Sequence, residues 1–222
     1  MNFQFSYFVE VIPKVARHLD ITLQLTLTAA IIALIFGTVL AVIRYYKIPI
    51  FYQLASIYIF IMRGTPVVVQ LYFFYFGLAT ASNIVREMQP VTAVAIVMSL
   101  NISAFMSESM RGALLSVDDG QKQAGYALGM SHALVIRRIV LPQAFRIALP
   151  ALFNDIINLI KMSSLAFMLG ILDVMGAAKV EGSQTFRYFE IYAAVMLIYL
   201  AVIAFCSFIH KYLEKKYSRA YG

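Results

Sequence analysis

Long apolar stretches alternate with short polar ones along most of this chain. Five of them, residues 21–43, 54–79, 91–110, 147–172 and 191–209, approach or exceed the length of about 20 residues that a helix needs to cross a bilayer. Continuous apolar runs of this kind are typical of transmembrane helices, whereas transmembrane barrel strands are shorter and alternate in polarity. The pattern predicts an all-α polytopic membrane protein with five transmembrane helices.

Composition strengthens this prediction. Of the 222 residues, 62% are hydrophobic and 13% are charged, and the mean hydropathy is +0.81. A soluble domain has about half apolar and about a quarter charged residues. The excess excludes a soluble enzyme, a disordered chain and a secreted disulfide scaffold. The one cysteine, Cys206, lies in an apolar run and is expected to be inert packing.

Basic residues are concentrated in the connections between the apolar runs. One side of the membrane receives eleven of them, Arg44, Lys47, Arg111, Lys122, Arg137, Arg138, Arg146, Lys211, Lys215, Lys216 and Arg219. The other side receives five, Lys14, Arg17, Arg86, Lys179 and Arg187. By the positive-inside rule, the N-terminus is outside and the C-terminus is cytoplasmic. Nothing resembles the clustered basic and aromatic face of a nucleic-acid-binding protein, so no nucleic acid partner is expected.

These features divide the chain into three parts. Residues 1–18 form an external or interfacial segment, residues 19–210 the transmembrane domain, and residues 211–222 a cytoplasmic tail. We expect no cleavable signal peptide, because the first twenty residues lack a long apolar stretch.

Polar residues inside the fourth run mark a candidate pathway. At about 100° per residue, Asn154, Asp155, Asn158 and Lys161 fall within an arc of about 120°, and Ser163 and Ser164 follow. Ionisable groups deep in a span usually face a cavity, a partner helix or a ligand. Pairing of Asp155 with Lys161 is the structural alternative, but for Asn158 and Lys161 we favour a solute or cavity role.

The third run carries Asn101 and Glu108, seven residues apart and nearly superposed on one helix face. Glu108 could take an ammonium group of a solute. It is also three residues from Arg111, and for this pair we favour a local ion pair.

Two other segments interrupt the apolar pattern. Gly64-Thr65-Pro66 lies within the second run and predicts a kink or an unwound turn at Gly64 and Pro66, with Thr65 exposed to a solute. Residues 111–146 form the one large cytoplasmic connection. There Asp118 or Asp119 can start a helix and Gly129 can end one, so we expect one or two short surface helices. They could dock on another protein, and a solvated connector is the alternative.

Catalytic and metal chemistry is not visible in the sequence. No Walker-type glycine loop occurs, so this chain is not expected to bind ATP by that route. The histidines have no metal-ligand spacing, no serine–histidine pair lies within an apolar run, and we predict neither a metal site nor a catalytic residue.

The cytoplasmic connection carries a resemblance to a known family. Gln123-Ala124-Gly125, Gly129, Ile139 and Leu141-Pro142 have the spacing of the EAA loop in permease subunits of ABC importers. That pattern is Glu-Ala-Ala, three residues, Gly, nine residues, Ile, one residue, Leu-Pro. Gln123 replaces its glutamate and Gly125 replaces its second alanine. Because Gln123 is uncharged, it cannot form any ion pair that the family's glutamate makes with its ATPase.

Other segments resemble the polar amino acid uptake branch of that family, which includes histidine, glutamine, arginine and cystine permeases. They are the RGTP…VQL signature at residues 63–71, the E-x-x-R-G segment at residues 108–112 and an L-x-K-x-T-S-L-A-like stretch at residues 159–166. Residues 164–175 look like permeases for cystine and related sulfur amino acids. With the EAA-like loop these matches cover about residues 19–210.

The resemblance implies a function as a non-catalytic permease subunit of a type I ABC importer in the inner membrane of a bacterium. Two ATP-binding subunits would attach at the EAA loop, a binding protein would deliver the solute outside, and a second permease copy, identical or homologous, would complete the pore. ATP would be bound by the partner subunits, and no cofactor by this chain. The candidate solute-binding residues are Thr65, Asn101, Glu108, Asn158, Lys161 and Ser164. The competing hypothesis is an ion-gradient-driven carrier or channel without an ATPase.

Overall fold

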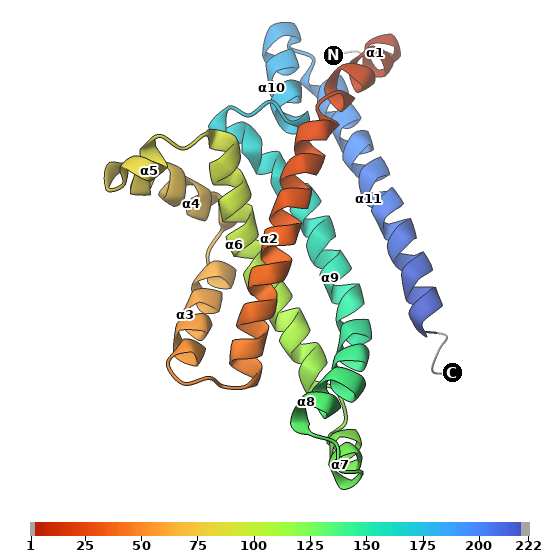
Figure 1. Cartoon of the computed structure of the whole chain (residues 1–222). Helices are drawn as coiled ribbons and strands as arrows, with labels where there is room; N and C mark the ends of the chain where they lie inside the picture. The colour runs from red at the N-terminus through yellow and green to blue at the C-terminus, as the bar shows by residue number, and fades with distance from the viewer. Residues whose placement is uncertain (1–2, 219–222) are drawn as a thin grey trace. The chain divides into compact units, whose positions relative to one another are not determined.

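The computed structural model describes residues 3–218, and within them every regular element is a helix. The longest helices are α2 (Leu19–Tyr45), α6 (Pro90–Leu115), α9 (Leu141–Ser163) and α11 (Tyr188–Ser218). The shorter ones are α1 (Phe5–Ala16), α3 (Phe51–Gly64), α4 (Val67–Tyr72), α5 (Asn83–Arg86), α7 (Asp119–Ala127), α8 (His132–Val135) and α10 (Val174–Thr185) (Figure 1). Two π segments, Phe73–Gly77 and Ile136–Val140, and two 3-10 segments, Leu78–Thr80 and Ser164–Leu169, complete the described elements.

Four continuous helical stretches are long and apolar enough to cross a membrane: Leu19–Tyr45, Pro90–Leu115, His132–Leu169 and Tyr188–Tyr212. A fifth candidate is the broken pair Phe51–Gly64 and Val67–Thr80. Four of the five predicted runs therefore lie in helices that could span a bilayer, and the second does so only if the broken pair, which is bent by 110°, forms one span. Three of the four continuous helices extend beyond their predicted runs at both ends, because apolar length marks the hydrocarbon core and not the helix ends. The stretch His132–Leu169 begins before the run 147–172 but ends before residue 172.

The second predicted run is not one helix. It divides at Thr65 and Pro66, between α3 and α4. Pro66 has an extended conformation (φ −64°, ψ 133°) and precedes the first residue of α4. A proline lacks the N–H that a helix interior needs, which accounts for the interruption.

The connection between the third and fourth runs is shorter than residues 111–146. Helix α6 continues to Leu115, and after α7 the chain is helical again from His132 through α8 and a π segment into α9. Ser131 caps this second stretch by accepting a hydrogen bond from the N–H of Leu134. The π segment immediately precedes α9, in which Pro142 has no N–H to donate.

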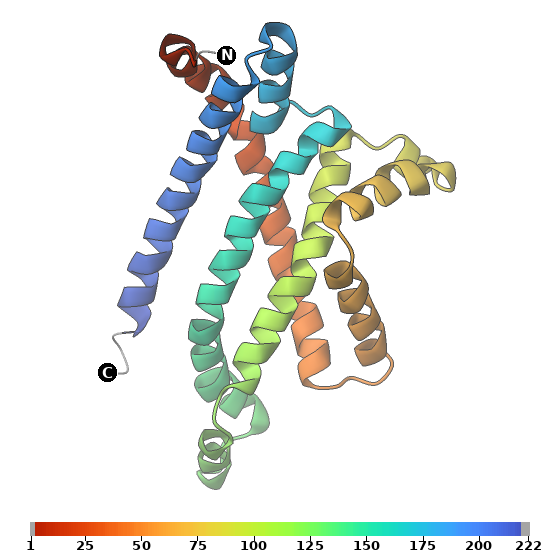
Figure 2. The same cartoon turned by 180° about the vertical axis from the view of Figure 1, so that it is seen from behind.

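The chain forms two compact units, and α2, α6, α9 and α11 each contribute to both. The first comprises the chain up to Ile31, Thr65–Ser99 and Ile156–Ile209, and the second comprises Ile32–Gly64, Leu100–Asp155 and the chain from His210. In the first unit, α1 and α10 lie beside the N-terminal end of α11 (Figures 1 and 2). Their shared core contains Val11, Val15, Val174, Ala178 and Ile191, each at most 1% exposed.

In the second unit, α6 packs closely against α2 and α3. A Cβ added to Gly37 of α2 would lie 3.0 Å from the carbonyl oxygen of Ser103, so a larger residue there would push the two helices apart slightly. From α3, the hydroxyl of Tyr58 donates a hydrogen bond of 2.6 Å to the carbonyl oxygen of Leu100. These contacts hold the polar residues of α6 described below.

Candidate translocation pathway and coupling surface

A polar stripe runs along α9. Asn154, Asn158 and Lys161 are exposed on this helix, although it lies within an apolar span. Among the described residues, no hydrogen bond or ion pair engages the ammonium group of Lys161. Exposed polar groups at membrane depth are costly unless they face water, a partner or a ligand. The stripe is therefore the surface of this chain best suited to a polar pathway.

Asp155 follows Asn154 but is buried, 7% exposed. Its Oδ2 accepts a hydrogen bond of 3.3 Å from the hydroxyl of Ser109 in α6. The structure therefore does not pair Asp155 with Lys161, the arrangement that the sequence left open. Ser109 was not among the predicted site residues; it directly follows Glu108, at a position that the E-x-x-R-G pattern leaves open, so the motif gave no signal for it.

Glu108 lies between two arginines in the second unit. Its carboxylate accepts a hydrogen bond of 2.8 Å from Nη2 of Arg111 and forms an ion pair with Arg44 of α2. The pairing with Arg111 agrees with the local ion pair that the sequence favoured. The contribution of Arg44 was missed, because it comes from a helix that is distant in sequence.

Asn101 is also occupied. Its side chain is almost fully buried in α6, and Nδ2 donates a hydrogen bond of 3.0 Å to the carbonyl oxygen of Met62 near the end of α3. The amide satisfies one of the carbonyl groups that have no partner at a helix C-terminus. In this structure Asn101 supports the end of α3.

The remaining predicted pathway residues belong to the first unit. Thr65 follows α3, and both its hydroxyl and its carbonyl oxygen accept hydrogen bonds from Nε2 of Gln70 in α4, at 2.8 and 3.2 Å. Ser164 begins the 3-10 segment after α9, and its hydroxyl donates to the carbonyl oxygen of Lys161 at 2.7 Å. Thus the structure places Asn158 and Lys161 together on one helix and gives Thr65 and Ser164 local partners.

The candidate coupling surface is built around α7. Asp118 caps this helix by accepting a hydrogen bond from the N–H of Gly120, and after α7 Gly129 adopts φ +76°. A positive φ of this size favours glycine. The sequence expectation of a helix started near Asp118 and ended by Gly129 is met.

Gly125 is the buried contact between α7 and the following helix. A Cβ at this position would lie 2.9 Å from Cδ1 of Ile139 and 3.0 Å from Cγ2 of Val135. An alanine methyl group at this position would therefore need the end of the Ile139 side chain to shift. Gln123 and Ala124 are exposed on α7, as are Leu141 and Pro142 at the start of α9.

The outer surface of this loop is available to another molecule. Leu128, directly after α7, is 83% exposed, and Tyr126 is 43% exposed. Lys122 donates a hydrogen bond of 2.8 Å to Asp119, and this bond raises the pKa of Lys122. Cationic and apolar groups thus lie close together on a helix outside the spans.

No group of three or more histidine, cysteine, aspartate or glutamate side chains within the described part of the chain could hold a metal ion. The polar residues described above hold helices together or line α9, and none is arranged as a nucleophile with a neighbouring base.

Comparison with known proteins gives a consistent result. The probable amino-acid ABC transporter permease protein PatM of Vibrio harveyi is 38% identical over 221 residues, covering 100% of this chain and 99% of the relative. The arginine transport system permease protein ArtQ of Bacillus subtilis (strain 168) is 36% identical over 216 residues, covering 97% and 98%. A solved structure, described as the crystal structure of an amino acid ABC transporter with histidines, is 33% identical, with a TM-score of 0.89 and coverage of 97% of this chain and 100% of that one.

Residues 33–219 match the family described as binding-protein-dependent transport system inner membrane component. With its membrane-spanning helices, the chain is a multi-pass membrane protein and a non-catalytic permease subunit of the ABC type. The chain therefore belongs to the family of inner membrane components of binding-protein-dependent transport systems.

Proposed function

We propose that this chain translocates a polar amino acid into the cytoplasm as the permease subunit of an ATP-driven importer, by alternating access. The observation that carries the proposal is the exposed Asn158 and Lys161 on an otherwise apolar span. The names of the relatives support amino acids as the solute class. Cystine is the first solute to test because of the resemblance in residues 164–175, and arginine is the second because of ArtQ.

Two ATP-binding subunits would dock on α7 and the residues that flank it, with the N-terminus outside and the C-terminus in the cytoplasm of a bacterium. Exposed Leu128 offers an apolar contact for docking. A binding protein would deliver the solute outside, in keeping with the family's description. A second permease copy, identical or homologous, would face this one across the pathway and cover the exposed stripe of α9.

The mechanism requires two states of the permease. A ligand shifts such an equilibrium only by as much as its affinity differs between the states, so both ATP in the partner subunits and the loaded binding protein must favour the outward-facing state. Closure of the ATP-binding subunits would move α7, and α7 would transmit this motion through Gly125 to α9. Hydrolysis would then return the pathway to the inward-facing state.

Within the pathway, Lys161 and the amide of Asn158 would bind the solute carboxylate. Thr65 and Ser164, which belong to the same unit as Lys161, would be further polar lining. Glu108 would take the ammonium group only after its ion pairs with Arg44 and Arg111 open.

The function is tested by reconstituting the permease with its ATP-binding subunits in vesicles and measuring uptake of labelled cystine and arginine, with unlabelled amino acids as competitors. Uptake should need ATP and the binding protein. Uptake driven by an ion gradient without ATP would contradict the proposal.

Replacing Lys161 by methionine tests the pathway. A hydrogen bond to a charged group contributes about 1.5–3 kcal/mol, so we expect uptake at low solute concentration to fall about 10- to 100-fold. Lys161→Arg, which keeps the charge, should retain part of the uptake that Lys161→Met loses. Wild-type uptake by Lys161→Met with unchanged apparent affinity would remove Lys161 from the site.

Replacing Gly129 by alanine tests the coupling surface. The left-handed conformation at this residue costs alanine about 1–2 kcal/mol, so α7 should dock less well and ATPase binding should weaken about tenfold. Gly129→Asn is the matched control, because asparagine tolerates this conformation better. Equal capture of the ATP-binding subunit by both variants would contradict a coupling role.

A further inference from the structure

The exposed surface of α1 is divided into two stripes of opposite character. Successive residues are about 100° apart around the helix axis, and the side chains fall into three neighbouring sectors, or arcs, around it. Val11 and Val15 lie at the centre of the buried arc. Next to it, Phe5, Val9 and Pro13 form an exposed apolar stripe. The rest of the surface is an exposed polar stripe, composed of Ser6, Glu10, Lys14 and Arg17.

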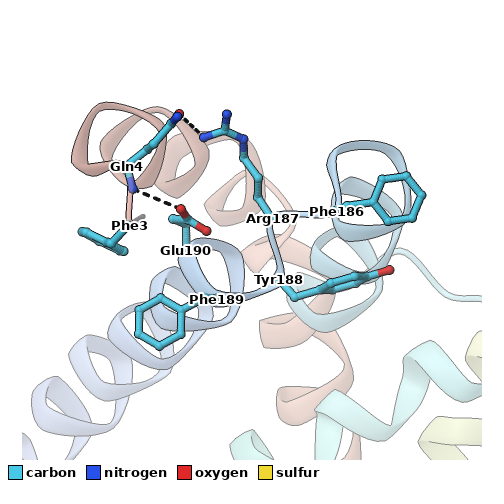
Figure 3. A pocket seen from close by; sticks show the side chains of 7 residues that line it. All are labelled: Phe3, Gln4, Phe186, Arg187, Tyr188, Phe189 and Glu190. Carbon is cyan, nitrogen blue, oxygen red and sulfur yellow. Dashed lines mark hydrogen bonds between the residues drawn. The ribbon is translucent and has the colours of Figure 1, made fainter. Parts of the chain in front are cut away.

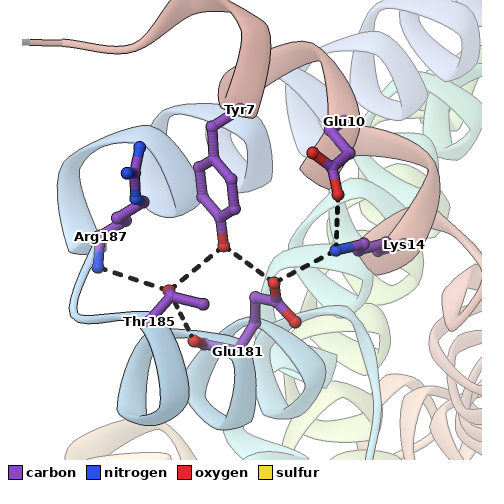
Figure 4. A network of polar contacts seen from close by, with 6 residues as sticks. All are labelled: Tyr7, Glu10, Lys14, Glu181, Thr185 and Arg187. Atoms are coloured by element: carbon purple, nitrogen blue, oxygen red, sulfur yellow. Dashed lines mark hydrogen bonds and ion pairs between the residues drawn. The ribbon is translucent and has the colours of Figure 1, made fainter.

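Contacts with α10 fix the rotation of α1 about its axis. The hydroxyl of Tyr7 donates a hydrogen bond of 2.8 Å to Glu181 and lies 3.2 Å from the hydroxyl of Thr185 (Figure 4). Lys14 forms ion pairs with Glu10 at 3.0 Å and with Glu181 at 3.6 Å. The polar stripe therefore borders α10, and the apolar stripe lies on the opposite edge of the docked face.

Contacts with α11 hold the N-terminal end of α1. The N–H of Gln4 donates a hydrogen bond of 3.1 Å to Glu190, and the side chain of Gln4 accepts one from Arg187 (Figure 3). Both figures of the whole chain show α1 leaving the line of α2 beside this end of α11. The helix is thus attached at both ends and cannot rotate freely.

Aromatic side chains connect the apolar stripe to the face of a membrane span. Phe5 packs on Phe8 with ring centroids 6.2 Å apart, Phe8 on Phe3 at 5.7 Å, and Phe3 on Phe189 of α11 at 5.8 Å. Phe189 is 71% exposed and begins a line of exposed apolar residues along α11 that continues with Met196 and Leu200. Within the apolar stretch of this span, only 22% of the residues are buried.

From this geometry we infer that α1 lies in the interface of the outer leaflet, with Phe5, Val9 and Pro13 in contact with lipid acyl chains. A helix that is apolar on one exposed side and charged on the other lies in the plane of the interface, with its apolar face about 5–10 Å below the headgroups. Two observations select lipid as the occupant. The stripe is continuous with the exposed apolar face of a span, and charged residues begin directly beside it.

The inference is tested with tryptophan as a depth probe, because the chain contains no tryptophan of its own. The full-length permease is prepared as Phe5→Trp, in the apolar stripe, and as Ser6→Trp, the next residue, in the polar stripe. Each variant is reconstituted into phosphatidylethanolamine–phosphatidylglycerol vesicles with or without lipid brominated on the acyl chains.

Phe5→Trp should show blue-shifted emission and be quenched several-fold more by brominated lipid than Ser6→Trp, while iodide in water should quench Ser6→Trp more. Strong quenching of both variants by iodide would show that the stripe faces water and would overturn the inference. Quenching of Phe5→Trp by neither agent would mean that protein covers the stripe, which also overturns it. If Phe5→Trp does not fold, the same comparison is made with Val9→Trp and Glu10→Trp. Because no ATPase or solute is involved, the outcome is independent of the proposed transport function.

Discussion

At the scale of single residues, charges inside the spans differ chiefly in whether another helix reaches them. The Glu108 side chain is 20% exposed and is shared between Arg111 of its own helix and Arg44 of α2. Lys161 is exposed and has no ion-pair partner in the described part of the chain. A paired charge can hold helices together at little cost, whereas an unpaired one at membrane depth needs water, a partner or a solute. In this structure Glu108 therefore joins α6 to α2, whereas Lys161 is exposed to whatever lies beside α9.

Replacing Glu108 by glutamine should destabilise the protein, because it leaves two half-buried guanidinium groups without a counter-charge. Removing one partner of a buried pair costs about 3–5 kcal/mol, and the partial exposure here suggests a loss of about 2–3 kcal/mol. This loss of stability is measured by thermal unfolding in detergent, followed with a thiol-reactive dye on Cys206. The control is Glu10→Gln, which breaks an exposed pair with Lys14 and should leave the unfolding temperature unchanged. Equal unfolding temperatures for the two variants would contradict the assignment.

At the scale of elements, short polar residues and glycines determine where the helices begin and end. Asp118 and Asp173 cap α7 and α10, and Gly129 and Gly170 take positive φ values after α7 and after the 3-10 segment that extends α9. Asp173 differs from Asp118 in being fully buried. One carboxylate oxygen accepts a hydrogen bond from the N–H of Gly176, and the other has no partner among the described residues.

Burial raises the pKa of Asp173 from 3.8 to about 6, although backbone N–H groups, chiefly that of Gly176, and His18 oppose the shift. The folded state holds the proton more tightly than the unfolded state. The contribution of Asp173 to the free energy of unfolding is therefore fully present below pH 4 and is lost as the pH rises through about 6. At neutral pH the free energy of unfolding is lower by an amount on the order of 2–3 kcal/mol.

Asp173→Asn keeps a capping oxygen and removes the ionisation. It should unfold at a higher temperature than the wild type at pH 7.5, and the difference should shrink as the pH falls towards 4. Unfolding temperatures of both proteins over this range provide the measurement. A difference independent of pH would mean that Asp173 does not ionise in this range.

At the scale of the whole molecule, function depends on which end of each span is inside. The count of basic residues predicts that α7 is cytoplasmic and that α1 and α10 are external. The proposed coupling surface on α7 and the proposed placement of α1 in the outer leaflet both depend on this orientation.

The orientation can be measured by cysteine labelling in a Cys206→Ser background, since Cys206 is the one native cysteine. Ser183→Cys on α10 and Leu128→Cys after α7 are both at exposed positions. A membrane-impermeant maleimide should label Ser183→Cys in spheroplasts and Leu128→Cys only in inverted vesicles. The reverse pattern would overturn both the topology and the proposed coupling loop.

The sequence by itself was sufficient to predict four continuous spans, the break at Gly64-Thr65-Pro66 within a fifth apolar run, the helix started near Asp118 and ended by Gly129, and the transporter family. Each of these depends on a local property: the length of an apolar run, the missing N–H of a proline, a cap, or a motif with fixed spacing.

Tertiary structure decided which polar groups meet. Arg44 reaches Glu108, Ser109 reaches Asp155, and Asn101 reaches the end of α3, because helices distant in sequence are packed together. An apolar run records what must avoid water, but the partner of each buried polar group is determined only when the helices pack.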